Sequence, residues 1–314
     1  KLWAHELAAY AEDDWSISDA FRLNVGLRFS LFNIDNRTYT GIEPRVSMRW
    51  LLSPDVSLKA SYSRMNQYVH LISNIFMDLP TDSWMPVTNK LKPLVSDQIS
   101  LGGYYNWNQL LDFSVEGYYK RMNNLLEYKD GYSLIPSSVS WENKMASGEG
   151  RAYGVEFMVR KQTGKTTGWV GYALAWADRQ FDEINKGRRY PSRYDNRHKL
   201  NIVVMHKLSK KVELSAAWTY SSGNYTTLSL ENYYPSDHLH QPGERPFWGN
   251  GTGEDYYDQR NNYQLPAYHR LDVGINIYRP KKKGRMGIWN ISIYNVYSRM
   301  NPILVYKGDV KEEA

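Results

Sequence analysis

The feature that most constrains this chain is an alternation of apolar and polar residues over unusually long stretches. The clearest example has every second residue apolar, namely Val212, Leu214, Ala216, Trp218 and Tyr220. Such a period of two places these side chains on one face of an extended strand. Residues 199–206 alternate in the same way, and the short polar run 207–211 separates the two stretches. The pattern predicts an antiparallel hairpin with a tight turn.

The same pattern returns along most of the sequence. It gives about twelve strands of roughly ten to fifteen residues each, whereas strands of soluble proteins usually have about five or six. A tilted strand needs about nine to eleven residues to cross a membrane. We therefore expect an all-β fold, a segment of a transmembrane antiparallel up-and-down β-barrel whose wall occupies residues 1–314 as a single unit.

Charged residues on the polar faces of these strands support this interpretation. In residues 21–32 the face opposite the apolar one carries Arg22 and Arg28. Burying unpaired charges in a dry core costs several kcal/mol, roughly 3–5 for a broken pair, whereas a water-filled lumen accepts them. Glu116 and Glu156 could form a pair of catalytic carboxylates. A solvated ion-pair lining is the simpler interpretation, with the two carboxylates beside arginines of the same face, namely Arg28, Arg49 and Arg160.

Connections between the predicted strands alternate between short turns and long polar loops. The long ones are expected at residues 33–41, 68–92, 123–150, 181–194 and 221–265. Bacterial outer-membrane barrels have short turns on the periplasmic side and long loops outside the cell. We assign the orientation of this chain in the same way. The apolar residues near 301–306 begin a further strand that the sequence does not complete, so closure of the barrel would need strands from elsewhere.

Composition limits the other classes of function. The chain has no cysteine, so no disulfide or thiolate metal site is expected. No apolar run is long enough for a membrane helix. Tyr (26) and Trp (11) outnumber Phe (8), which favours rings at boundaries between lipid and water. The net charge of +6 could suggest nucleic acid, but the lysines gather in turns and not along one recognition element, so no nucleic-acid partner is predicted.

No catalytic constellation is found, and we expect no enzyme, no cofactor and no metal. His238 and His240 could offer two imidazoles, but no third ligand follows at a suitable spacing. The candidate ligand-binding residues are aromatic rings on the polar outer loops, which could grip a ligand by stacking or simply pack their own loops. They are Trp84, Trp141, Tyr225, Tyr233, Tyr234, Trp248, Tyr256 and Tyr257.

Several short motifs, in this order and spacing, resemble the C-terminal barrel half of TonB-dependent outer-membrane receptors. They are LAAYAEDDW (7–15), ASYSRMNQY (60–68), YGVE (153–156), YDNRH (194–198), YHRLD (268–272) and YNVY (294–297). The motifs most resemble those of Bacteroidetes receptors, in which a carboxypeptidase-regulatory-like domain often precedes the receptor. The resemblance implies an outer-membrane location and a 22-stranded parent barrel. It also implies a plug and a TonB-recruiting segment outside this chain, with the final strand missing as well.

Three functions remain open at this stage. An active importer would take up a scarce nutrient, such as a siderophore, glycan or peptide, and could work with a surface lipoprotein. A passive porin or surface adhesin would use the same barrel without TonB coupling. A soluble β-rich binding module would pack its apolar faces inward. The first two place lipid against the apolar faces and water in the lumen.

Overall fold

The computed structural model describes residues 3–72, 83–130, 132, 139–233, 254–281, 284–302 and 305, with the backbone alone at 232–233 and 254–255. Antiparallel strands dominate these residues. Two short 3-10 helices, η1 (Trp141–Lys144) and η2 (Asn185–Gly187), lie in the connections. Within the described residues there is no helix of the length and apolarity that crossing a membrane requires. The prediction of an all-β chain is confirmed.

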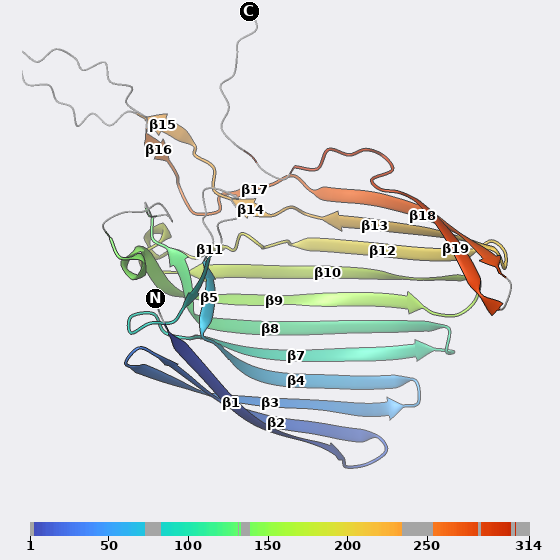
Figure 1. Ribbon diagram of the computed structural model, residues 1–314, viewed down its shortest axis with the longest axis horizontal. Coiled ribbons are helices and arrows are strands. Elements are labelled where there is room, and N and C mark those ends of the chain that lie inside the picture. The colour runs from blue at the N-terminus through green and yellow to red at the C-terminus, as the bar shows by residue number, and fades with distance from the viewer. Residues whose placement is uncertain are drawn as a thin grey trace, which may run out of the picture.

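One large sheet contains the long strands, which follow the order β1-β2-β3-β4-β7-β8-β9-β10-β12-β13-β18-β19 (Figure 1). Each is antiparallel to its neighbour, and twelve strands form this path in the described part of the chain, in agreement with the sequence. Their bounds are β1 (Ala4–Ser16), β2 (Phe21–Ile34), β3 (Arg37–Ser53), β4 (Val56–Gln67), β7 (Leu94–Trp107), β8 (Leu111–Tyr128), β9 (Met145–Lys161), β10 (Thr166–Gln180), β12 (His198–Lys207), β13 (Val212–Ser221), β18 (Tyr268–Pro280) and β19 (Met286–Ile293).

The other strands are short and belong to the connections. β11 (Tyr190–Pro191) pairs with the end of β10. The remaining six form three ribbons, β5 with β6, β14 with β17 and β15 with β16. Their bounds are β5 (Val69–Ile72), β6 (Ser83–Pro86), β14 (Tyr225–Thr226), β15 (Glu231–Tyr233), β16 (Glu254–Tyr256) and β17 (Tyr263–Gln264).

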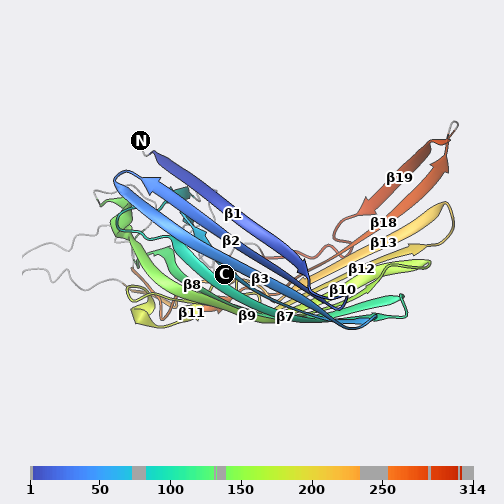
Figure 2. The same cartoon turned by 90° about the horizontal axis from the view of Figure 1, so that it is seen from below.

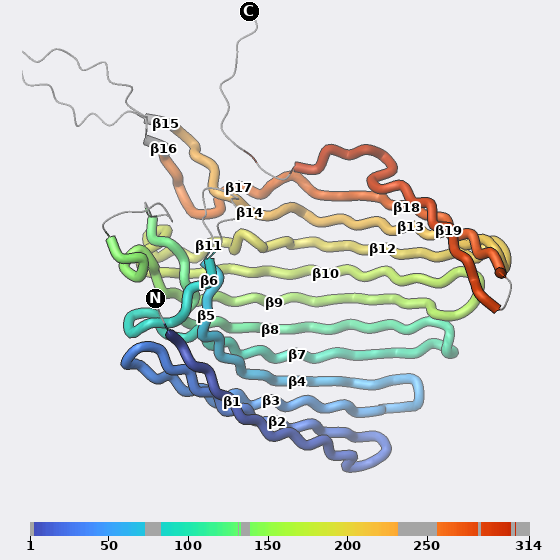
Figure 3. Tube along the Cα trace, viewed as in Figure 1, coloured from blue at the N-terminus to red at the C-terminus, as the bar shows by residue number. Residues whose placement is uncertain are grey.

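Short turns gather at one end of the large sheet and long connections at the other (Figure 3). One predicted loop is wrong. Residues 33–41 are almost entirely strand, because β2 runs to Ile34 and β3 begins at Arg37, which leaves a two-residue turn. Asp35 has a φ of +48°, in the left-handed region that such tight turns require. The strict alternation of short and long connections therefore fails at the first outer connection and holds at the later ones.

Apolar residues of the strands face outward. Leu214 and Ile291, which would converge on a dry centre in a soluble sheet, are both exposed, as are Leu27, Val115 and Phe157. The buried apolar residues instead form three small clusters outside this face. They are Ile72, Leu91, Leu126, Tyr128 and Met145; Leu125, Ala146, Phe181, Ile184 and Tyr190; and Phe32, Ile34, Tyr68 and Val87.

These clusters combine the outer ends of strands with residues of the long connections. The polarity expected for a barrel wall is therefore present, with an exposed apolar face and small cores under the loops. The sheet is curved, and its two edges are β1 and β19 (Figure 2). Within the described residues neither edge strand has a second neighbour in the large sheet.

Candidate functional site

One row of residues across the polar face of the sheet carries two separate groups of charges. The register places Arg22, Arg49 and Lys59 directly opposite one another on β2, β3 and β4. Two strands further along the same row, Glu116 of β8 lies directly opposite Glu156 of β9. Since opposed residues of antiparallel strands share a face, three cations and two carboxylates line the same space.

A glycine and a tyrosine of β7 lie between the cationic group and the two carboxylates. Gly102 of β7 lies in the row between Lys59 and Glu116. The Tyr104 hydroxyl donates a hydrogen bond of 2.5 Å to Oε1 of Glu116, and Nζ of Lys59 lies 3.9 Å from the centre of the Tyr104 ring. A Cβ at position 102 would meet Cγ of Glu116 at 2.9 Å, so glycine leaves room for this contact. The row borders a depression of about 350 Å³.

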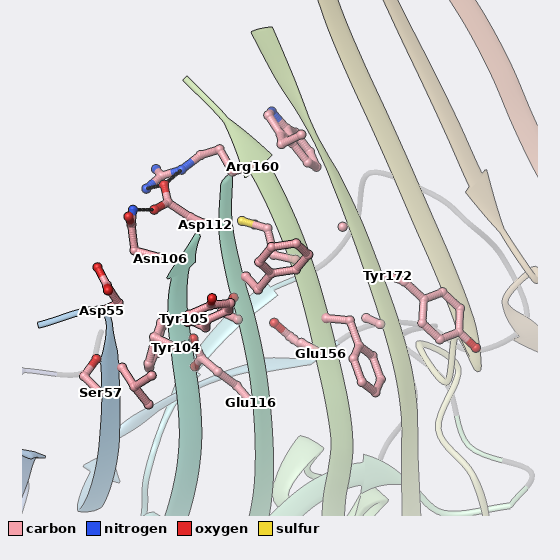
Figure 4. A pocket seen from close by; sticks show the side chains of 18 of the residues that line it. Asp55, Ser57, Tyr104, Tyr105, Asn106, Asp112, Glu116, Glu156, Arg160 and Tyr172 are labelled. Atoms are coloured by element: carbon pink, nitrogen blue, oxygen red, sulfur yellow. Dashed lines mark hydrogen bonds and ion pairs between the residues drawn. The ribbon is translucent and has the colours of Figure 1, made fainter. Parts of the chain in front are cut away.

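A second polar cluster lies nearer the turn end of the same face, in a hollow of about 670 Å³ (Figure 4). Asp112 of β8 accepts hydrogen bonds from Nη2 of Arg160 at 3.1 Å and from Nδ2 of Asn106 at 2.6 Å. The charge of Arg160 is thus balanced by Asp112. At this end of the polar face the two side chains form an ion pair that water can reach, since Arg160 and Asp112 are 51% and 36% exposed.

The expected ion-pair lining exists, but its pairs differ from those predicted. Arg28 lies with its Nε 3.7 Å from Oε2 of Glu43 and its Nη2 3.5 Å from Oε1 of Glu6. Within the described residues neither Glu116 nor Glu156 makes an ion pair, so the prediction that they lie beside Arg28, Arg49 and Arg160 is wrong in its contacts. The sequence shows which face a residue occupies, whereas the pairing depends on the stagger between distant strands.

At the outer end of the sheet, Arg260 fastens the longest connection (222–267) to β8. Its side chain is only 5% exposed. Nη1 donates to Oδ1 of Asp130 at 2.8 Å, and Nη2 donates to the carbonyl oxygen of Tyr128 at 3.2 Å. The same guanidinium lies 3.6 Å from Oε2 of Glu127. A buried arginine with two carboxylates and a carbonyl is a stable arrangement only while all of these partners are present.

Glu127 collects further partners from the next connection. The hydroxyl of Tyr190 donates to Oε2 of Glu127 at 2.7 Å, and Arg179 donates to Oε1. Burial raises the pKa of the Tyr190 hydroxyl, and the charge of Glu127 and the hydrogen bond to it raise the pKa further. Tyr190 therefore stays protonated and acts as a hydrogen-bond donor throughout the physiological range.

Asparagines complete the link between the long connections. The backbone N–H of Asn185 donates to Oδ2 of Asp130 at 3.1 Å, and the backbone N–H of Arg260 donates to Oδ1 of Asn185 at 3.2 Å. Nδ2 of Asn261 donates to the carbonyl oxygen of Pro191 at 2.8 Å. The connections 129–144, 181–197 and 222–267 are thus held to one another by side chains. We call this set, with Glu127, Tyr190 and Arg260, the outer polar network.

The sequence did not point to the outer polar network. Arg260 and Asp130 are separated by 130 residues, and no local pattern relates them. One signal was present, because residues 221–265 contain six acidic residues and only two arginines. An arginine that stands almost alone in an acidic loop is a good candidate for a structural ion pair, although its partner cannot be read from the sequence.

The first group of predicted ligand-binding aromatics lies on the β5–β6 ribbon and on η1. Trp84 is 63% exposed, so its ring is available to a ligand. Trp141 is half-buried and packs against the cluster that contains Ile72 and Leu126. Met85, the neighbour of Trp84, packs against the same cluster. The structure therefore brings the two elements together but gives Trp141 a packing role.

The second group lies on the connection between β13 and β18. Tyr225 is half-buried on β14, whereas Tyr256 on β16 and Tyr257 are exposed. Backbone pairing places Tyr233 opposite Glu254, and the ribbon β15–β16 extends beyond the end of the large sheet (Figure 1). The side chain of Tyr233 and the whole of Tyr234 and Trp248 lie outside the described residues.

The predicted histidine pair also lies outside the described residues, since 234–253 are not described. Within the part of the chain that is described, no group of three or more histidines and acidic residues has the arrangement of a metal site.

Comparison with known proteins identifies the family. The TonB-dependent receptor-like β-barrel family matches residues 4–296. The chain belongs to that family. The resemblance inferred from the short motifs is therefore confirmed at the level of a TonB-dependent receptor barrel. No curated protein matches the sequence.

Solved TonB-dependent receptors share the fold at low sequence identity. The ferripyoverdine receptor of the Pseudomonas aeruginosa outer membrane is 15% identical, with a TM-score of 0.62 over 94% of this chain and 35% of that one. The iron transporter FrpB of Neisseria meningitidis is 16% identical, with a TM-score of 0.62 over 95% and 42%. The copper transporter OprC is 14% identical, with a TM-score of 0.64 over 94% and 42%.

This TonB-dependent receptor barrel thus spans between 35% and 42% of the length of those three proteins. Its family consists of receptors and transporters of the Gram-negative outer membrane and not of enzymes. The outward apolar face and the charged inner face described above are the features that such a location requires.

Proposed function

We propose that this chain forms part of the wall of an active importer, which takes up a scarce nutrient across the outer membrane with energy transmitted by TonB. The observation that carries the proposal is the combination of a charged, water-accessible inner face with outer connections fastened over one end of it. A structural scaffold alone would need no exposed aromatic rings on those connections. The named relatives are a ferripyoverdine receptor and transporters of iron and copper, which supports a scarce nutrient as cargo.

We infer that strands outside this chain complete the wall. The open edges at β1 and β19 support this inference, because unpaired backbone groups are not tolerated in lipid. The family resemblance implies a 22-stranded barrel, a plug in its lumen and a segment that recruits TonB. Bacteroidetes ancestry and a partner surface lipoprotein are further proposals that rest on the motif style alone.

The nutrient would first contact the aromatic rings of the outer connections. Trp84 and Tyr256 are the best candidates, because both are exposed and both lie on ribbons at the outer end. Flat exposed rings suit the stacking surfaces of siderophores, glycans or peptides. Trp141 contributes by packing its own loop, since it rests on a buried cluster.

Uptake assays on the complete protein test this proposal. Trp84→Ala and Tyr256→Ala should reduce uptake of the nutrient identified in a screen of labelled ferric siderophores, oligosaccharides and peptides. Trp50→Ala, an exposed tryptophan on the apolar face of the sheet, is the matched control and should leave uptake unchanged. Unchanged uptake in both loop variants would remove these rings from the site. Uptake that persists without TonB would favour the passive pore.

A further inference from the structure

The apolar face of β8, β9 and β10 ends in an aromatic row at its outer side. Tyr119, Tyr153 and Trp176 lie directly opposite one another across the three strands. Their ring centres are 6.3 Å and 5.3 Å apart, and both pairs are stacked. Aromatic rows of this kind mark the boundary between hydrocarbon and headgroups.

An ionic row follows one step further out on the same face. Arg121, Arg151 and Asp178 lie directly opposite one another, two residues beyond Tyr119, Tyr153 and Trp176 respectively. Nε of Arg151 lies 2.8 Å from Oδ2 of Asp178. Because side chains alternate between the faces of a strand, the shift by two residues keeps both rows on the lipid-facing side.

Arg189 and Glu149 extend this ionic row. Nη1 of Arg189 lies 2.5 Å from Oδ1 of Asp178, and its Nη2 lies 3.2 Å from Oε1 of Glu149. Nη2 of Arg121 lies 3.2 Å from Oε2 of the same glutamate. We call the three arginines Arg121, Arg151 and Arg189, with the acids Glu149 and Asp178, the arginine belt. It holds three positive and two negative charges.

The ion pairs within the arginine belt do not use all of the guanidinium N–H donors. Arg151 uses only its Nε within the belt, and the side chains of Arg121 and Arg151 are 60% and 41% exposed. These two arginines are direct cross-strand neighbours, so their side chains begin about 5 Å apart. Two neighbouring guanidinium groups that are exposed and have N–H donors unused within the belt can bind phosphate oxygens.

The depth of the arginine belt in the membrane determines which part of the lipid it contacts. From Leu111 to Tyr119 the strand β8 advances about 27 Å, which a tilt of about 40° reduces to about 21 Å of membrane depth. The belt therefore lies just beyond the hydrocarbon on the side of the long connections, which is the outer leaflet. In the Gram-negative outer membrane this leaflet consists of glycolipid whose headgroup carries phosphates.

We propose that the arginine belt binds the phosphorylated headgroup of an outer-leaflet glycolipid of the lipid A type. Arg121 and Arg151 contact its phosphate oxygens. Arg189 pairs with Glu149 and Asp178, so these two acids leave N–H donors of Arg121 and Arg151 available to the phosphate. The aromatic row below supports the first part of the acyl chains. This contact lies on the outside of the wall and does not depend on the imported nutrient.

The test uses the complete protein extracted from outer membranes in mild detergent, with diphosphoryl lipid A as the probe and phosphatidylglycerol as the comparison lipid. Native mass spectrometry measures how many lipid molecules each variant retains at increasing lipid concentration. Heat-modifiable migration on gels confirms that each variant has a folded barrel. The variants are the double substitution Arg121→Gln with Arg151→Gln, the single substitution Glu149→Gln, and the control Lys161→Gln.

Opposite shifts are expected from the two kinds of variant. The arginine double variant should bind lipid A at least tenfold more weakly than the unmodified protein. Glu149→Gln should bind it more tightly, because it removes a competing acid from Arg121 and Arg189. Lys161, on the same face of β9 at the turn end, should have no effect when substituted. A purely structural ion-pair cluster would make Glu149→Gln neutral or harmful to binding.

The proposal is overturned if the folded double variant retains lipid A as well as the unmodified protein, or if phosphatidylglycerol binds as tightly as lipid A. It is also overturned if Glu149→Gln weakens lipid A binding. Because nutrient uptake is not measured, a failure here leaves the importer proposal standing.

Discussion

Substitution of two neighbouring residues of β9 offers a direct test of which face of the wall meets lipid. Phe157 and Met158 are almost equally exposed, at 45% and 42%, yet they point to opposite faces. Phe157 lies four residues from Tyr153 in the aromatic row and four residues from Lys161 at the turn end. It therefore lies near the middle of the hydrocarbon, where an arginine on a barrel surface costs about 2–4 kcal/mol.

The expected loss for Phe157→Arg can be refined from its contacts. The ring stacks on Tyr172 with centres 6.3 Å apart, an arrangement that contributes about 0.5–1.5 kcal/mol. The free energy of unfolding should therefore fall by about 2.5–5.5 kcal/mol. Phe157→Ala separates the lost packing from the cost of the charge. Met158→Arg should change the free energy of unfolding by less than about 1 kcal/mol, because water already reaches that face.

Denaturant titration of the complete protein, refolded into lipid vesicles, measures these differences. Circular dichroism and gel migration report the folded fraction at each concentration. Equal losses for Phe157→Arg and Met158→Arg would refute the assignment of lipid to one face, since exposure alone would then determine the effect. A larger loss for Met158→Arg would reverse the assignment.

Two further predictions concern the outer connections. Arg260→Met removes the hydrogen bonds that the longest connection makes to Asp130 and to the carbonyl oxygen of Tyr128, while Arg179 and Tyr190 still contact Glu127. Hydrogen exchange in residues 181–197 and 254–265 should therefore accelerate by a factor that corresponds to about 1.5–3 kcal/mol, while the wall stays folded. The exposed Arg188→Gln should change exchange little, and equal exchange in both variants would contradict the network. Burial lowers the pKa of His70 below its usual value of about 6.5, so the unfolded ribbon binds a proton more readily than the folded one. The stability of the ribbon is therefore complete above about pH 6.5 and is lost as the pH falls toward the lower pKa of the folded state. Hydrogen exchange in the β5–β6 ribbon should rise on acidification, and His70→Asn should remove this pH dependence.

The wall could be predicted from the sequence because its rule is local. Wherever lipid lies on one side and water on the other, every second residue must be apolar, and residues 212–220 show this directly. The sequence pattern predicts a loop at residues 33–41, because the alternation of apolar and polar residues stops beyond the membrane. There the strands β2 and β3 continue, held by backbone hydrogen bonds and by packing of Phe32 and Ile34 against Tyr68.

The outer site could be predicted only in part. The exposed rings of Trp84 and Tyr256 lie on outer ribbons as their polar surroundings indicated. The buried packing of Trp141 was not visible, because it depends on Ile72 and Leu126, which are distant in the sequence. Contacts of this kind are set by how the connections fold over the strand ends, and no periodic pattern records them.

The structure separates what stabilises the wall from what stabilises the connections. The wall buries its apolar face in lipid, so its stability depends on the membrane as much as on the chain. The outer connections have their own buried clusters and the outer polar network, both made by the chain itself. A substitution at Arg260 should therefore loosen the connections without unfolding the wall, and one at Phe157 should weaken the wall without reorganising the connections. Such independence means that the proposed ligand-contacting surface can be altered without changing the strands that carry it.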